Sequence, residues 1–288
     1  MNDNKTLIFY HGDCPDGFGG AYTAWKKFGD AAEYIGLKHG KPFTEDVTGK
    51  DVYFIDFCYP KEIMDGIATK AASLTILDHH EGMEDVVMAF PSHVYDSNRS
   101  GASIAWAYFH PDEPIPELLA YVEDDDLFRF SLPETRPVLT YLTARPFTFA
   151  AWDTIAQALS GDASRRELLA TARAYAEYFE LLAEVAVENA KLIEFEGHQV
   201  YFATAHPLKP MKSLVGSRLA KKKGPFALVV SAHPEGFGVS IRGDGTVDVA
   251  KIAQKYGGNG HPKSAGFKIE WTSALPWKMV EENDPPQD

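Results

Sequence analysis

Three short segments of the sequence that each follow an apolar run carry carboxylates, and two of them also carry imidazoles. The residues concerned are His11, Asp13, Asp16, Asp56, Asp78, His79 and His80. Carboxylates that share a site repel one another unless cations lie between them. Mixed carboxylate and imidazole ligands suit Mn²⁺, Fe²⁺, Co²⁺ or Zn²⁺ better than Ca²⁺. Seven candidate ligands are more than one ion can bind, so we expect two ions about 3.5–4 Å apart, with the Asp56 carboxylate as the ligand that bridges them.

The apolar runs before these residues are typical of strands that alternate with helices. Strands are expected at residues 7–10, 52–57, 74–77 and 93–95, and helices at 17–28, 61–72 and 102–109. This alternation predicts a parallel sheet covered by helices. A single Asp or His after a strand is usually a turn former. Three such strand ends favour a shared site, because the carboxyl ends of parallel strands lie at one edge of the sheet, where open α/β folds bind ligands.

A second, smaller α/β domain is expected after a long helical stretch at 162–192, which contains no Gly or Pro. This stretch should pack against the core and bridge the domains, and a dimer-forming role is the less favoured alternative. Later strands are expected at 199–204, 227–231 and 238–241, with helices at 212–222 and 249–256. Prolines and acidic residues beyond Trp271 predict a flexible tail. The expected domains are therefore 1–190 and 195–270, followed by a tail at 271–288.

Charge is unevenly divided along the 288 residues, whose net charge is −13. Residues 1–190 carry −16, residues 191–270 carry +6, and the last 18 carry −3. The first part suits cations and the second suits anions, although uneven surface charge alone gives the same numbers. The acidity argues against a non-specific duplex binder. With two cysteines, no signal-peptide pattern and no apolar run of membrane-spanning length, the expected location is the cytoplasm, without a membrane partner.

The order of these motifs resembles that of the DHH family of phosphoesterases. Asp78-His79-His80 follows an apolar strand, His11-x-Asp13-x-x-Asp16-Gly17 lies upstream, and Asp56 lies between them. The segment Gly257-Gly258-Asn259-Gly260-His261 with Ala265-Gly266 is similar to the glycine-rich segment of the family's C-terminal substrate-binding domain. Many relatives space the first two aspartates by one residue, whereas Cys14-Pro15 intervenes here. Asn259, which interrupts the glycine run, tolerates positive φ better than other non-glycine residues.

The resemblance implies a ligand set for two divalent metal ions, with Mn²⁺ favoured. In this set His11 and Asp13 bind the first ion, Asp16 and His79 bind the second, and Asp56 bridges. The run Glu123-Asp124-Asp125-Asp126 supplies one more ligand, with Asp124 as first choice and Asp126 as second. Asp78 would orient His79 from behind, and His80 would face the reacting phosphate. Cys14 and Cys58 are expected to be free buried thiols rather than zinc ligands or a disulfide.

Substrate-binding groups are expected in both domains. Ser100 and Gly101 precede a helix whose N-terminal N–H groups suit an anion, and Arg99 lies beside them. In the second domain the resemblance implies anion binding by Ser240, Arg242, Gly258, Gly260 and His261. The catalytic set is then His80, Asp78 and Arg242, at an active site in the cleft between the domains.

The expected activity is metal-dependent hydrolysis of phosphomonoester or phosphodiester bonds. Its substrates would be nucleotides or short single-stranded oligonucleotides, as for nanoRNases, other exonucleases of the family and bisphosphonucleoside phosphatases. Two alternatives stay open, a hydrolase of polyphosphate or another phosphoanhydride and a catalytically inactive nucleotide-binding protein. A homodimer also stays open.

Overall fold

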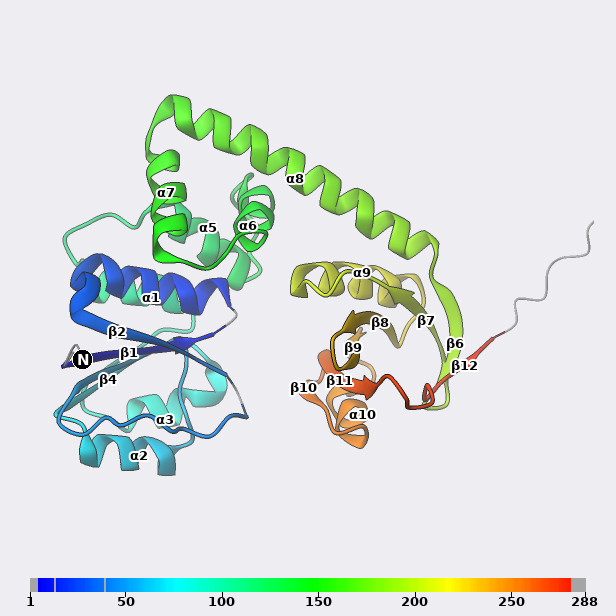
Figure 1. The fold of residues 1–288 in the computed structure, drawn as a ribbon, viewed down its shortest axis with the longest axis horizontal. Coiled ribbons are helices and arrows are strands. Elements are labelled where there is room, and N and C mark those ends of the chain that lie inside the picture. The colour runs from blue at the N-terminus through cyan, green and yellow to red at the C-terminus, as the bar shows by residue number, and fades with distance from the viewer. Residues whose placement is uncertain (1–4, 13, 39, 281–288) are drawn as a thin grey trace, which may run out of the picture. The chain divides into compact units, whose positions relative to one another are not determined.

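The chain folds into two units. The structure, a computed structural model, describes residues 5–12, 14–38 and 40–280 (Figure 1). Unit 1 is Met1–Ala176 and unit 2 is Glu177–Asp288. The boundary falls inside α8 (Asp162–Glu188), a helix of 27 residues that begins in unit 1 and ends in unit 2. Each buried apolar cluster that the structure describes draws its residues from one unit.

Five parallel strands form the sheet of unit 1, in the order β2-β1-β3-β4-β5. Their bounds are β1 (Thr6–His11), β2 (Ala32–Leu37), β3 (Asp51–Ile55), β4 (Ser73–Asp78) and β5 (His93–Tyr95). Successive side chains of a strand point to opposite faces. Leu7 and Phe9 accordingly join one buried cluster, and Ile8 joins the cluster on the other face. The sheet is therefore buried on both faces.

Helices cover both faces of this sheet (Figure 1). α2 (Lys61–Lys70) and α3 (Glu84–Met88) pack on the face of Leu7, and α1 (Pro15–Phe28) and α4 (Gly101–Phe109) pack on the face of Ile8. A further layer covers α1 and α4 around Phe18 and Trp152. It consists of α5 (Glu117–Asp126), α6 (Thr135–Thr143) and α7 (Phe149–Ser160). Two short 3-10 helices are η1 (Gly29–Ala31) and η2 (Glu81–Met83).

Unit 2 is built on a second sheet, in the order β10-β11-β9-β8-β7-β6-β12. Only β7 and β8 pair in parallel, and the other described pairs are antiparallel. α9 (Lys209–Lys222) packs on one face with the end of α8, and α10 (Val249–Lys255) packs on the other. The strands are β6 (Lys191–Phe195), β7 (His198–Thr204), β8 (Phe226–His233), β9 (Gly236–Gly243), β10 (Asn259–His261), β11 (Ser264–Glu270) and β12 (Lys278–Met279).

The α/β class, with a parallel first sheet and a second α/β unit, is confirmed. The prediction of a flexible tail is wrong for residues 271–280. Trp277 is buried in the core of unit 2, and β12 pairs with β6, so this stretch is part of the fold. Residues 281–288 lie outside the described part. No helix among the described residues is long and apolar enough to cross a membrane.

Candidate functional site

The carboxylate of Asp16 lies against the first turn of α4. Its Oδ2 accepts the N–H of Gly101 at 2.6 Å and its Oδ1 accepts that of Ala102 at 2.9 Å. Gly101 permits this approach, because a Cβ there would lie 2.5 Å from the Cβ of Asp56. Burial, together with the charges of Asp56 and Asp126, raises the pKa of Asp16 well above its ordinary value. A nearby cation would relieve that repulsion.

Asp56 follows β3 with a positive φ of 55°, and three imidazoles surround its buried carboxylate. Oδ1 lies 3.1 Å from His79 Nε2 and 3.7 Å from His80 Nδ1, and Oδ2 lies 3.4 Å from His11 Nδ1. Burial works against the charge, but the contacts with His11 and His79 hold the pKa of Asp56 at about 2. Asp56 is therefore the charged centre of the cluster.

Asp78, at the end of β4, fixes the two histidines that follow it. Its Oδ1 accepts the backbone N–H of His79 at 2.7 Å and that of His80 at 3.1 Å, and lies 2.7 Å from His80 Nδ1. The ring that Asp78 contacts is that of His80, so the expectation that it orients the His79 ring is corrected. This hydrogen bond raises the pKa of His80. Asp78 thus positions the His79 main chain and the His80 imidazole.

The ring of His79 is held by three carboxylates. Its Nε2 lies 3.1 Å from Asp56 Oδ1, 3.6 Å from Asp16 Oδ2 and 3.6 Å from Asp126 Oδ2. Burial lowers the pKa of His79, but the hydrogen bond with Asp56 and the neighbouring charges raise it to about 9. Without metal, the imidazolium of His79 offsets part of this negative charge.

Asp124, expected as the fourth-motif ligand, has other contacts. Its carboxylate accepts hydrogen bonds from the Ser131 N–H at 2.9 Å, the Ser131 hydroxyl at 2.6 Å, the Leu132 N–H at 3.1 Å and the Thr135 hydroxyl. These donors from the loop after α5 and from the start of α6 occupy its acceptor positions. Asp126 lies in the cluster beside His79 instead, so Asp126 replaces Asp124 in the candidate ligand set.

The donor set fits divalent metal ions. Three groups have ligand atoms within 4.8 Å of one another, and the first two share Asp56. They are His11, Cys14 and Asp56; Asp56, His79 and His80; and Asp16, His79 and Asp126. Asp56 Oδ2 is buried without a hydrogen-bond partner among the described residues, which is costly unless a cation or another group satisfies it. Cys14 is a neighbour that the motif does not include, and burial first of all raises the pKa of its thiol to about 12. Asp13 lies outside the described residues.

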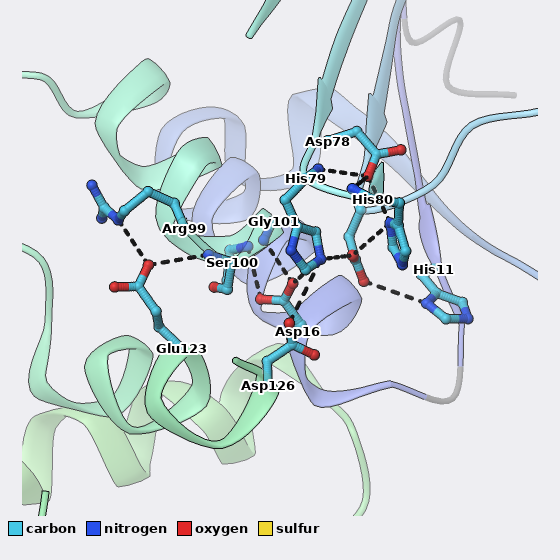
Figure 2. A network of polar contacts seen from close by, with 12 residues as sticks. His11, Asp16, Asp78, His79, His80, Arg99, Ser100, Gly101, Glu123 and Asp126 are labelled. Atoms are coloured by element: carbon cyan, nitrogen blue, oxygen red, sulfur yellow. Dashed lines mark hydrogen bonds and ion pairs between the residues drawn. The ribbon is translucent and has the colours of Figure 1, made fainter. Parts of the chain in front are cut away.

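The groups expected to bind phosphate in unit 1 have partners within the protein. Glu123 Oε2 accepts from Arg99 Nε at 2.8 Å and from the Ser100 N–H at 3.1 Å (Figure 2). The hydroxyl of Ser100 caps α4 by accepting the N–H of Ser103. Arg99 and Ser100 therefore do not form an open anion site in this structure. The carboxylates of Asp16 and Glu123 already accept the N–H groups at the start of α4.

Unit 2 holds a groove of about 860 Å³ along β9 and β11. Ser240, Arg242 and Gly258 line it, with Lys212 and Lys268. Arg242 Nη1 donates to the Ser240 hydroxyl at 3.0 Å, and among the described residues no carboxylate pairs with it. Burial lowers the pKa of Arg242. A partly buried guanidinium without a carboxylate partner is suited to bind an anion.

Gly257 and Gly258 of the expected motif line this groove, and Gly260 follows in the adjoining hairpin. A Cβ on Gly258 would collide with the carbonyl of Gly266, and Gly260 has a φ of 152° and would collide with Ala265. Both glycines therefore serve the close approach of β10 to β11. His261 is exposed in this hairpin and is not among the lining residues described.

The chain is similar to one known protein in sequence and to several solved structures in fold. No model of a known protein family matches the chain. An uncharacterized protein of Acanthamoeba polyphaga mimivirus is 26% identical over 304 residues, which cover 97% of this chain and 71% of that protein. The structure of a pGpG-specific phosphodiesterase, PggH from Vibrio cholerae, is similar with a TM-score of 0.52 and 13% identity, over 92% of this chain and 93% of that one.

Two further structures extend the comparison. The DHH domain of a protein assigned to a family of ribosomal proteins gives a TM-score of 0.52 at 14% identity, over 95% of this chain and 82% of that one. The chain has the fold of a DHH domain. An exopolyphosphatase-related protein from Bacteroides fragilis gives 0.50 at 13% identity, over 94% of this chain and 87% of that one.

Within this DHH fold, sequence reasoning found most of the clustered side chains and missed two features. The contacts of Glu123 with Arg99 and Ser100 were not predicted from the sequence. The position of Cys14 beside His11 and Asp56 was not predicted either. The spacing of Cys14 from Asp16 was the available signal for the thiol. Glu123 had none, because its contact depends on how α5 is rotated about its axis.

Proposed function

We propose that this chain is a metal-dependent phosphohydrolase that cleaves phosphomonoester or phosphodiester bonds of nucleotides or short oligonucleotides. The observation that carries the proposal is the buried carboxylate of Asp56, which three imidazoles surround and whose Oδ2 lies 3.4 Å from His11 Nδ1 but accepts no hydrogen bond from a described residue. The DHH fold supports the same class of chemistry, and one protein of similar fold is a phosphodiesterase specific for the dinucleotide pGpG.

Divalent ions, with Mn²⁺ favoured, would supply Lewis-acid stabilisation of phosphate oxygens and an activated water. The residues that would hold them are His11, Asp16, Asp56, His79 and Asp126, with Asp13 as a further proposed ligand. The chain's own groups do the remaining work. His80 is a donor to the phosphate, and Asp78 orients its ring and favours the protonated form. The His80 side chain is 39% exposed, so a substrate can reach it.

We assign anion binding in unit 2 to Arg242 and Ser240, with Gly258, Gly260 and His261 shaping the neighbouring hairpin. Arg242 keeps its hydrogen-bonding capacity for a ligand because its described partners are neutral oxygens. The net charge of +6 over residues 191–270 has the sign that a phosphate substrate requires.

Hydrolysis of a substrate panel tests the proposal. The panel holds a linear dinucleotide, RNA strands of up to twenty nucleotides, a 3′,5′-bisphosphorylated nucleoside and polyphosphate, each with Mn²⁺ or EDTA. We expect Mn²⁺-dependent cleavage of nucleotides or of strands of about two to five nucleotides, because few phosphates are neutralised and no long basic groove is evident from the sequence. Preferential cleavage of polyphosphate would favour a phosphoanhydride hydrolase instead.

Variants separate the roles in the same assay. Asp56→Asn should lower kcat by at least about 10³, the scale of a lost key electrostatic group, whereas the exposed Asp112→Asn is the matched control. Arg242→Ala should raise KM with the metal content intact, because ground-state binding is lost. An Asp56→Asn enzyme that keeps half its activity would refute the metal-centred mechanism.

A further inference from the structure

The loop after α5 has an unusual backbone. Phe128 has a φ of 52° and Phe130 a φ of 47°, so two aromatic residues in three positions adopt the left-handed region. This region is unfavourable for residues with a Cβ, and aromatic residues rarely adopt it. Such conformations persist where the surrounding structure enforces them, and they cluster at functional sites.

Asp124 enforces this conformation. Its carbonyl accepts the N–H groups of Arg129 at 3.0 Å and Phe130 at 3.3 Å, while its carboxylate binds the end of the loop through Ser131 and Leu132. Arg129 adds hydrogen bonding to the carbonyl of Asn98 and an ion pair with Glu123. The loop is therefore tied to its own helix and to the segment before α4.

The side chain that this rigid loop presents is Phe128. Phe128 is 81% exposed, the largest value among the exposed large hydrophobic residues described. Phe130 meets it edge to face at 6.0 Å between ring centroids, and the guanidinium of Arg136 lies 4.6 Å from the Phe130 ring. The Phe128 ring is therefore supported by one aromatic neighbour, and most of its surface is open to solvent.

Phe128 lies close to the metal-ligand cluster. It follows Asp126 by two residues, so their Cα atoms are at most about 7 Å apart. The carboxylate of Asp126 lies 3.6 Å from His79. In a nucleotide a single sugar separates the base from its phosphate, so a surface for the base has to lie near the groups that bind the reacting phosphate.

We propose that Phe128 is a stacking platform for the nucleobase next to the scissile phosphate. The inference rests on the proposed function and adds to it the part of the substrate that unit 1 recognises. An aromatic face stacks on any base, and the Phe side chain offers no hydrogen-bonding group. This contact therefore favours a substrate that carries a base over one that lacks it, but does not discriminate among the bases. The strained loop keeps the ring in place before the substrate arrives, which lowers the ordering cost of binding.

The test compares Phe128→Ala, Phe128→Trp and Phe128→Gly with the control Tyr178→Ala, which removes another exposed ring, from α8. Each is assayed on a dinucleotide and on its abasic analogue, which lacks the base beside the scissile phosphate. We expect the ratio of kcat/KM for the dinucleotide over the analogue to fall about tenfold in Phe128→Ala, within the range of one lost stacking contact. Phe128→Trp should restore it, and Tyr178→Ala should not change it.

Phe128→Gly removes the ring and the backbone strain together, so it distinguishes a loss of base binding from a loss of stability. Glycine accepts a φ of 52° without penalty, so this variant should raise Tm while the ratio still falls. A ratio that stays at the wild-type value in Phe128→Ala and Phe128→Gly would overturn the proposal, and so would an equal loss on both substrates.

A binding measurement keeps this test independent of hydrolysis. Calorimetric titration with AMP or GMP should show about tenfold weaker binding to Phe128→Ala than to the wild type. If the wild type cleaves nothing, the proposed function fails, and the titration still decides the role of Phe128. Unchanged nucleotide affinity with an altered oligomeric mass would make Phe128 a contact between protein chains and overturn the stacking role.

Discussion

Asp124 and Asp126 are separated by one residue in α5, and the helix points their side chains in different directions. A helix turns about 200° over two residues, so their side chains leave it on nearly opposite sides. Asp124 binds Ser131 in the loop after α5 and Thr135 at the start of α6, and Asp126 lies beside His79. The sequence shows a run of acids but not the rotation of the helix, and for this reason it could not decide between the two.

Substitution of each aspartate by asparagine should separate these roles. Asp124→Asn should lower the free energy of unfolding by about 2 kcal/mol, because buried donors lose a charged acceptor, and should keep the Mn²⁺ affinity. Asp126→Asn should weaken Mn²⁺ binding at least about tenfold without loss of stability in EDTA. Urea denaturation and calorimetric titration with Mn²⁺ measure the two effects. The reverse pattern would return Asp124 to the ligand set.

The stability from Asp124 also has a defined pH dependence, which the same denaturation series reports. Burial opposes its charge, but hydrogen bonds from Ser131 and Thr135 lower the pKa of Asp124 to about 2. Its contribution is therefore complete above about pH 4, near the pKa of an unfolded aspartate, and is lost as the pH falls through about 2.

At the scale of elements, the close packing of α4 against β3 and α1 brings Asp16 and Asp56 together. Gly101→Ala would place a methyl group 2.5 Å from the Asp56 Cβ and 3.1 Å from Asp16 Oδ2. We expect a loss of about 1–3 kcal/mol in unfolding free energy from overpacking, with weaker Mn²⁺ binding. Gly66→Ala is the matched control, because its Cβ meets no atom within 4 Å.

Thermal denaturation in EDTA and Mn²⁺ titration check this prediction. Gly66, in the exposed part of α2, should gain up to about 1 kcal/mol when replaced by alanine, since glycine is a poor helix former. A Gly101→Ala protein with normal stability and normal metal affinity would show that α4 can shift without disturbing the site.

The sequence predicted the strands that carry the cluster because they are continuous apolar runs buried on both faces. β1, β3 and β4 were expected for this reason, and they position His11, Asp56 and Asp78. β2 was missed because it is an edge strand whose burial varies irregularly along its length. The layer of α5, α6 and α7 was also missed. Its core forms between helices far apart in the sequence, a contact that local periodicity cannot show.

At the scale of the whole molecule, the ligand cluster lies in the acidic stretch 1–190 and the groove with Arg242 in the basic stretch 191–270, whereas the boundary between the units falls earlier, after Ala176. The end of the second unit was misjudged from composition. Prolines and acids beyond Trp271 indicated a tail, whereas a buried Trp277 and the pairing of β12 with β6 depend on contacts with residues about 80 positions earlier.

Because each described buried cluster draws its residues from one unit, we expect the two units to melt in two separate events. A ligand that binds only the folded form of one unit raises the melting temperature of that unit alone, so Mn²⁺ at about 100 times its Kd should move the transition of unit 1 upward by about 5–10 °C. The transition of unit 2 should stay in place, and Asp56→Asn should abolish the shift. Differential scanning calorimetry in EDTA and in Mn²⁺ measures both. A single transition that moves as a whole would mean that the two cores unfold as one cooperative block.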